Sequence, residues 1–151
     1  MVCQQLKPLR YVSFTSSTDG CVIDVKRGPA PSFRVDVDGI ERAVAEHNPK
    51  ILFLTSPNNP DGSVLDESDL ERLLCLPVLV VLDEAYVEFS SSYTSRIAEV
   101  PNRKNLIVLR TFSKRAGLAG ELLAVVDEVF FTHILHYAKE SAWVTVLSQT
   151  N

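Results

Sequence analysis

Three apolar runs in this sequence each lead into a short polar segment whose side chains could do chemistry. The runs occupy residues 51–54 (Ile-Leu-Phe-Leu), 78–82 (Val-Leu-Val-Val-Leu) and 105–109 (Asn-Leu-Ile-Val-Leu). The polar segments offer an amide, a carboxylate with a phenol, and hydroxyls beside an amine, a set that suits a phosphorylated aromatic cofactor held through a lysine. The candidate site residues are Asn59, Asp83, Tyr86, Thr111, Ser113 and Lys114.

The apolar runs also predict where these side chains lie. Continuous apolar runs are typical of strands buried on both faces of a parallel sheet. Ligands of open α/β sheets bind just beyond the carboxyl ends of such strands. We therefore expect an α/β fold, a mostly parallel sheet flanked by helices, with the site at the carboxyl edge of the sheet.

The segments around the runs have the patterns of further strands and helices. A short strand is expected over residues 21–25, and Asp38 is expected to cap a helix that ends at residues 48–49 (Asn-Pro). A second helix, over residues 67–75, would join the first two runs into a βαβ unit. The residues expected to face the core from this helix are Leu70, Leu73 and Leu74.

Lys114 follows two hydroxyl-bearing residues, Thr111 and Ser113. An amine attacks an aldehyde only when it is deprotonated, so a reactive lysine has to be desolvated or placed beside positive charge. Once freed, the same amine can move a proton as a general base. The alternative is a solvated lysine on a loop, which is what most lysines are.

Asp83, Tyr86 and Asn59 each have a structural alternative as well. An Asp after a strand often caps the following turn, a Tyr can be a half-buried core residue, and an Asn before Pro can simply form a turn. For any one of them alone, the structural alternative would prevail. Their joint occurrence with the lysine segment favours a cofactor site.

Three sequence motifs resemble those of a known family. They are Ser-Pro-Asn-Asn-Pro-Asp-Gly at residues 56–62, Asp-Glu-Ala-Tyr-Val-Glu-Phe at 83–89, and Arg-Thr-Phe-Ser-Lys-Arg-Ala-Gly-Leu-Ala-Gly at 110–120. In this order they resemble the central part of the aminotransferases of fold type I that depend on pyridoxal 5'-phosphate (PLP), most of all the histidinol-phosphate aminotransferases of plants. The resemblance is tight over residues 51–120 and looser back to Tyr11.

The resemblance implies PLP as cofactor, no metal, and a role for each candidate residue. Lys114 would form the Schiff base, and Asp83 would keep the pyridine nitrogen protonated. Tyr86 and Asn59 would hydrogen-bond the phenolic oxygen of the cofactor. The positions that match the hydroxyls binding the cofactor phosphate are Thr111 and Ser113.

The implied reaction is amino transfer between histidinol phosphate and 2-oxoglutarate, in histidine biosynthesis. The family's full-length members are expected to act as homodimers. A plant member would work in plastids and another member in the cytoplasm, and no transit segment opens this chain.

The sequence departs from the family after Gly120. The position of the family's phosphate-clamping arginine is Leu122, the ring-stacking aromatic is lacking upstream of Tyr11, and residues 121–151 contain no family words. We therefore expect two parts: residues 1–120, a partial large (PLP-binding) domain, and residues 121–151, an unrelated or aberrant segment from a splice variant, retained intron or gene-model error. The small domain is absent, so the implied activity is that of a truncated form, weak or lost.

Composition argues against several other classes. The 151 residues include 15 Lys and Arg against 19 Asp and Glu, a net charge of -4, which speaks against a nucleic-acid surface. The most apolar window, residues 122–137, is interrupted by charged residues and histidines and does not predict a membrane span. Cys3, Cys21 and Cys75 lack metal-binding or CxxC spacing, which favours a reduced intracellular protein.

Two other functions remain open. One is a non-catalytic remnant or splice product that binds a full-length family member. The other is a nucleotide hydrolase, because an apolar strand ends in Asp83-Glu84 as in a Walker B segment, although the sequence lacks the Gly-rich phosphate loop such an enzyme needs. Glu84 itself is expected to be a surface or incidental residue, like Arg115 and the histidines His47, His133 and His136.

Overall fold

The structure is a computed structural model that describes residues 2–3, 21–111 and 122–125. Within these residues six strands form one sheet, in the order β2-β1-β3-β4-β5-β6. Neighbouring strands are parallel except β5 and β6, which are antiparallel, so the predicted mostly parallel sheet is confirmed. The strands are β1 (Val2–Cys3), β2 (Ile23–Asp24), β3 (Ile51–Thr55), β4 (Leu79–Asp83), β5 (Leu106–Thr111) and β6 (Leu122–Val125).

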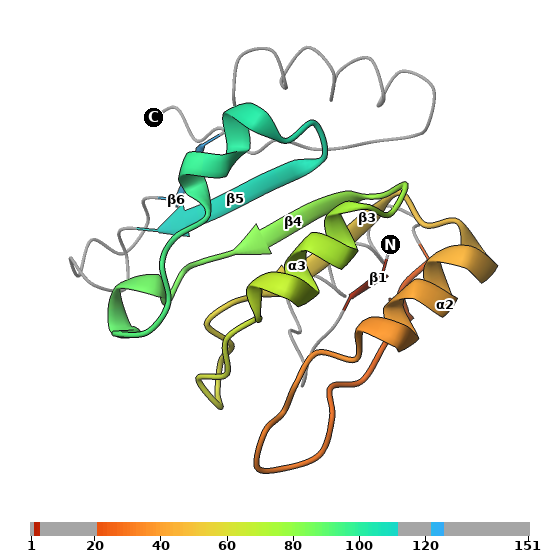
Figure 1. The fold of residues 1–151 in the computed structure, drawn as a ribbon, viewed down its shortest axis with the longest axis horizontal. Coiled ribbons are helices and arrows are strands. Elements are labelled where there is room, and N and C mark those ends of the chain that lie inside the picture. Colours follow the sequence, from red (N-terminus) through yellow and green to blue (C-terminus); the bar gives the residue numbers. More distant parts are fainter. Residues whose placement is uncertain (1, 4–20, 112–121, 126–151) are drawn as a thin grey trace.

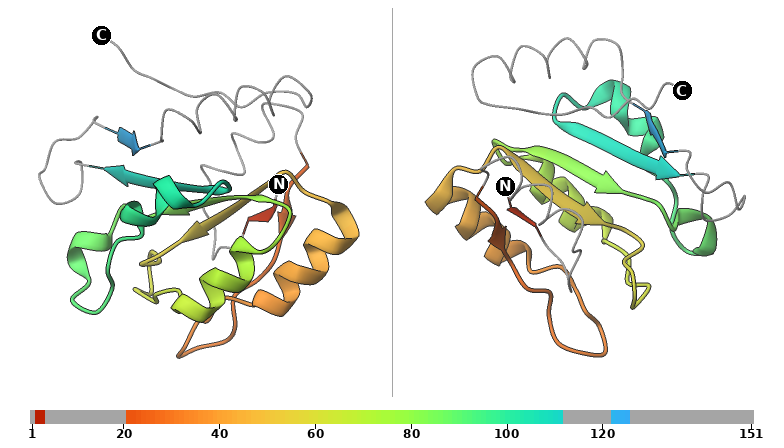
Figure 2. Two further views of the ribbon diagram at one scale, coloured as in Figure 1. Left: turned by 45° about the horizontal axis from the view of Figure 1, so that its top comes forward. Right: turned by 180° about the vertical axis from the view of Figure 1, so that it is seen from behind.

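Two α-helices lie side by side on one face of this sheet (Figures 1 and 2). They are α2 (Val37–His47) and α3 (Glu67–Leu74), and α3 joins β3 to β4 as the sequence predicted. Two short 3₁₀ helices, η1 (Val87–Phe89) and η2 (Ile97–Asn102), occupy the connection between β4 and β5. The sequence did not predict either of them.

Side chains of the strands alternate between the two faces of the sheet. In β4, Val80 and Leu82 are buried in the main core beneath the helices, whereas Val81 belongs to a smaller cluster on the opposite face. Asp83 continues the alternation of Val81, and Glu84 continues that of Leu82. The residues that α3 contributes to the main core are Leu70, Leu73 and Leu74, as predicted.

The register of the parallel strands brings three strand ends together. Asp83, the last residue of β4, lies opposite Thr55 of β3 on one side and opposite Leu109 of β5 on the other. The loops that follow these strands therefore start from one edge of the sheet, where the sequence predicted the site.

The N-cap of α2 is Asp36, so the prediction of Asp38 was wrong. The Asp36 carboxylate accepts a hydrogen bond of 2.9 Å from the backbone N–H of Gly39. Asp38 instead lies in the first turn, where its carboxylate pairs with Arg72 of α3 at 2.7 Å. Asp36 and Asp38 are equally good caps by residue type. The helix begins at the buried Val37, so the residue that precedes its first turn is Asp36.

Buried Arg27 fixes the loop that follows β3. Its guanidinium donates to the carbonyl of Thr55 at 2.9 Å, to the Ser63 hydroxyl at 3.0 Å and to the carbonyl of Phe33 at 3.2 Å. Burial lowers the pKa of Arg27, and the nearby charge of Asp61 opposes that shift in part. The two ends of the loop are thus tied to one cation.

Hydrogen bonds within the same loop complete its shape. Asp61 accepts from the backbone N–H of Ser63 at 2.8 Å and from the side-chain amide of Asn58, which in turn accepts from the Thr55 hydroxyl at 2.5 Å. Gly62 has a φ of 73°, in the left-handed region that glycine adopts without strain. Burial raises the pKa of Asp61, but the hydrogen bonds from Ser63 and Asn58 and the charge of Arg27 outweigh it and leave the pKa lowered.

None of the helices in the described part of the chain has the length and apolar character required to cross a membrane.

Replacing Asp36 by Ala is expected to lower the free energy of unfolding by about 1 kcal/mol, because the first turn of α2 loses its cap. Asp38→Ala removes only an exposed ion pair and should have a smaller effect. Urea denaturation of both variants checks this. A larger loss for Asp38→Ala would show that Asp38 is the cap after all.

Arg27→Lys should lower the free energy of unfolding by about 1–3 kcal/mol, because one ammonium group cannot serve all three partly buried acceptors. Hydrogen exchange at residues 56–63 should also become faster. The matched control is Arg34→Lys, since Arg34 is an exposed arginine paired with Asp66 and Asp69. Equal effects of the two substitutions would contradict an anchoring role for Arg27.

Candidate functional site

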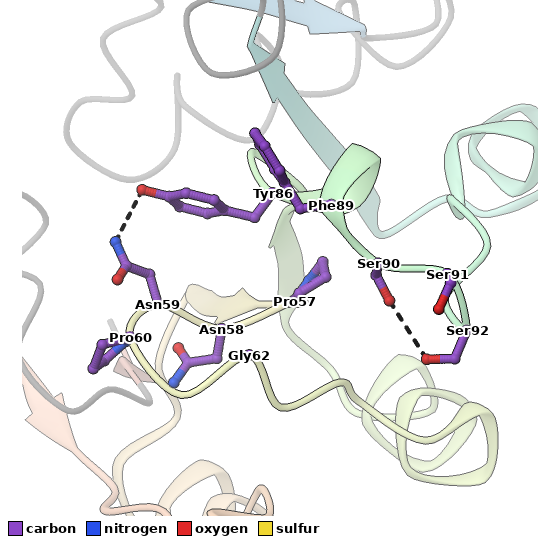
Figure 3. A pocket seen from close by; sticks show the side chains of 10 residues that line it. All are labelled: Pro57, Asn58, Asn59, Pro60, Gly62, Tyr86, Phe89, Ser90, Ser91 and Ser92. Carbon is purple, nitrogen blue, oxygen red and sulfur yellow. Dashed lines mark hydrogen bonds between the residues drawn. The ribbon is translucent and has the colours of Figure 1, made fainter.

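A pocket of about 400 Å³ lies beyond the ends of β3 and β4. The loop after β3 forms one side of it and the segment after β4 forms the other (Figure 3). Its walls combine proline rings, amides, two aromatic rings and hydroxyls. The lining residues are Pro57, Asn58, Asn59, Pro60, Gly62, Tyr86, Phe89, Ser90, Ser91 and Ser92.

Asn59 and Tyr86 meet at this pocket, although they come from different loops. The side-chain amide of Asn59 donates a hydrogen bond of 2.9 Å to the phenol oxygen of Tyr86, and Figure 3 shows the two side chains reaching toward each other. The ring of Phe89 lies 6.2 Å from that of Tyr86, tilted by 47°. Phe89 is 64% exposed, so its ring is available at the surface beside the pair.

Asp83 lies at the end of β4, next to the pocket in the fold but outside its lining. Its carboxylate accepts a hydrogen bond of 2.9 Å from the backbone N–H of Ala85. This is the turn-capping bond that the structural alternative for Asp83 expects. The role of Asp83 beside the ring nitrogen of a cofactor stays a prediction.

The third part of the predicted site lies mostly outside the described residues. Ser113 and Lys114 are not described, and Thr111 is described only as the last residue of β5. Their convergence with the other candidate residues stays a prediction. The strand register does place Leu122, the position of the family's phosphate-clamping arginine, opposite Thr111.

Glu84 is the clearest correction to the sequence analysis, which took it for a surface or incidental residue. It is 0% exposed. Its carboxylate accepts hydrogen bonds from the Tyr93 hydroxyl at 3.0 Å, from the Ser95 hydroxyl at 2.5 Å and from the backbone N–H of Arg96 at 2.8 Å. Burial and the neighbouring Glu84 carboxylate raise the pKa of Tyr93.

A signal for Glu84 was present in the sequence. A residue that follows a buried strand continues the alternation of that strand, so Glu84 falls on the helix-covered side with Val80 and Leu82. Phe89 and the serines of the pocket were also missed, because residues 90–95 have the composition of an ordinary surface loop. In the described part of the chain, no group of three or more His, Cys, Asp or Glu is arranged to hold a metal ion.

Curated relatives match this chain over much of its length. It is 55% identical over 108 residues to the chloroplastic histidinol-phosphate aminotransferase of Nicotiana plumbaginifolia, a match that covers 71% of this chain and 25% of the relative. Histidinol-phosphate aminotransferase 1 of Arabidopsis thaliana, also chloroplastic, is 56% identical with the same coverage. The chain therefore spans about a quarter of the length of these curated relatives (25%).

Solved structures share the fold. The histidinol-phosphate aminotransferase of Sinorhizobium meliloti, crystallised with pyridoxal-5'-phosphate, matches 90% of this chain and 38% of its own, with a TM-score of 0.75 and 26% identity. YbdL of Escherichia coli, with a methionine aminotransferase function, matches 93% of this chain and 39% of its own, with a TM-score of 0.73; at 21% identity it supports the fold alone. The predicted fold class is thereby confirmed.

A family model agrees with both comparisons. The model for "Aminotransferase class I and II" matches residues 6–138, which is most of the chain and runs past Gly120. This chain therefore belongs to the aminotransferase class I and II family.

Proposed function

We propose that this chain is a partial PLP-dependent aminotransferase, and that its full-length form transfers an amino group between histidinol phosphate and 2-oxoglutarate. The observation that carries the proposal is the hydrogen bond of 2.9 Å between Asn59 and Tyr86, which both line the pocket beyond the ends of β3 and β4. Two residues that the family uses at one cofactor oxygen are far apart in the sequence and adjacent in space. Identity of 55% to a plant histidinol-phosphate aminotransferase supports the substrate assignment.

The residues at this edge of the sheet fit the cofactor. The pocket of about 400 Å³ is bordered by the Asn59–Tyr86 pair, which offers hydrogen bonds to a phenolic oxygen, and Asp83 ends the strand that leads into the segment carrying Tyr86. PLP, when bound, supplies an electron sink for the bonds that change at the amino acid carbon. The protein has to orient this group and to manage the protons around it.

Each candidate residue would have a defined role towards the cofactor. Asp83 would hold a proton on the ring nitrogen, and Tyr86 with Asn59 would hydrogen-bond the phenolic oxygen. Lys114 would hold the cofactor at its aldehyde group and, when its amine is free and neutral, would act as general base. The hydroxyls proposed to bind the phosphate are those of Thr111 and Ser113.

The chain is proposed to act as two parts, a partial large domain over residues 1–120 and an unrelated or aberrant segment over residues 121–151. Sequencing the transcript across the codons for Gly120 and Glu121 tests this boundary. The names of the plant relatives support a plastid location, and a homodimer is proposed for the full-length form.

The alternatives differ in strength. A non-catalytic remnant that binds a full-length family member is the main rival, because the chain spans only 25% of its plant relatives. A nucleotide hydrolase is not favoured, since the chain belongs to the aminotransferase family. In addition, the carboxylate of Glu84 is fully buried and bonded to three protein donors, which leaves it poorly placed to act on a nucleotide.

Titration of the purified chain with PLP is expected to give a weak, saturable absorbance band in the visible range that borohydride bleaches. Lys114→Ala should abolish the band, because the covalent bond to the aldehyde is lost. Lys104→Ala, which removes an exposed lysine near the start of β5, should leave it unchanged. A band of equal strength in Lys114→Ala would refute the assigned lysine, and no band in any protein would support the remnant.

Turnover of histidinol phosphate with 2-oxoglutarate is expected to be no greater than in Lys114→Ala. Groups that stabilise a transition state act as a unit, and losing one commonly costs orders of magnitude in rate. Here Leu122 is proposed to stand at the position of the family's phosphate-clamping arginine, and the chain spans only 25% of the length of its plant relatives. Glutamate consumption or formation in a coupled assay measures this, and robust Lys114-dependent turnover would prove the expectation wrong.

A further inference from the structure

The turn that carries Tyr86 is held by carboxylates on both sides of that residue. Glu84 lies two residues before Tyr86 and Glu88 two residues after it, and both carboxylates reach the guanidinium of Arg110 on β5. The Arg110 to Glu84 distance is 3.9 Å, and Arg110 and Glu88 form a direct ion pair. Tyr86 itself points toward Asn59, into the pocket of Figure 3.

Glu84 is the more firmly held of these two carboxylates. It is 0% exposed, and a buried charge is tolerated only where donors compensate for the loss of water. Three hydrogen bonds from residues 93–96 do so, and Arg110 adds both its charge and a hydrogen bond of 3.1 Å to the Ser95 hydroxyl. A main-chain hydrogen bond adds to these contacts: the N–H of Glu84 donates to the carbonyl of Leu109 at 2.9 Å.

This arrangement connects the two later parts of the site. Arg110 comes directly before Thr111, at the end of the strand that leads toward Lys114. A shift of Glu84 would move the turn with Tyr86 and would remove one of the two carboxylates paired with Arg110, which would keep its ion pair with Glu88. Moving the turn would also alter the bond between Tyr86 and Asn59, a residue that Glu84 does not itself contact.

We propose that Glu84 is a positioning residue: together with Arg110 it fixes the turn carrying Tyr86 against the end of β5, and so sets the Asn59–Tyr86 pair relative to the segment that leads to Lys114. Its importance for a cofactor rests on the proposed function. The positioning role itself does not depend on the proposed function, and it can be tested without any cofactor.

One ¹H–¹⁵N spectrum of the full chain reports both on the contacts of Glu84 itself and on the more distant Asn59–Tyr86 bond. The backbone amide of Arg96 donates to Glu84 and senses the carboxylate directly, whereas the side-chain amide of Asn59 senses the distant bond to Tyr86. In Glu84→Gln, which keeps the size and removes the charge, we expect both signals to move. The control is Glu99→Gln, because Glu99 also pairs with Arg96, at 3.0 Å, and should leave Asn59 unchanged.

A shifted Arg96 signal with an unmoved Asn59 signal would overturn the proposal, since Glu84 would then be only a local structural residue. Should Glu84→Gln fail to fold, Tyr93→Phe, which removes one hydroxyl donor to the same carboxylate, decides by the same two signals.

A second measurement links the geometry to the cofactor. Glu84→Gln is expected to weaken PLP binding by about 2- to 30-fold, the range over which changes in packed networks alter coupling between sites. Unchanged affinity in a variant whose Asn59 signal has moved would overturn that link. If the wild-type chain binds no PLP, the proposed function fails, while the spectrum still decides whether Glu84 positions the pair.

Discussion

The parallel pairing of β3, β4 and β5 is the constraint on which the rest of this structure depends. Parallel neighbours finish at the same edge, so the register of Thr55, Asp83 and Leu109 gathers three loops into one region. The register is enforced by the core, because a slip of one residue would turn each buried side chain to the opposite face. Such a slip would also exchange the environments of Asp83 and Glu84.

Those two adjacent carboxylates have different environments because successive residues of a strand face opposite sides of the sheet. Asp83 is partly buried, and its carboxylate accepts from the backbone N–H of Ala85 in the turn after β4. Glu84 is fully buried against residues 93–96, where its carboxylate holds other parts of the protein. Chemical type is the same in both positions, and the difference comes from the face of the sheet and from the donors found there.

The sequence alone was sufficient to predict the elements that follow from the spacing of apolar residues. Apolar runs located β3, β4 and β5, and the spacing of leucines in α3 located its buried face. It was insufficient where long-range partners decide. The alternation of β4 indicates on which side of the sheet Glu84 lies, but the pattern does not identify its donors in residues 93–96 or the Thr55 carbonyl that Arg27 binds.

The segment after Gly120 gives a different result. The sequence analysis identified no family motif there, whereas the family model matches residues 6–138 and residues 122–125 form β6 and pair with β5. Backbone pairing requires an extended chain with free N–H and C=O groups and only weakly constrains the side chains. Strand formation there is therefore compatible with many sequences.

The strand order has a consequence for how the sheet is built during synthesis. Among the described strands, β1 appears first, and each later strand pairs with one that has already been made: β2 and β3 with β1, then β4 with β3, β5 with β4, and β6 with β5. None of the described strands has to insert between two others that are already joined. These strands can therefore pair one after another in chain order, and β5, which leads toward Lys114, docks onto β4 once β3 and β4 are in place.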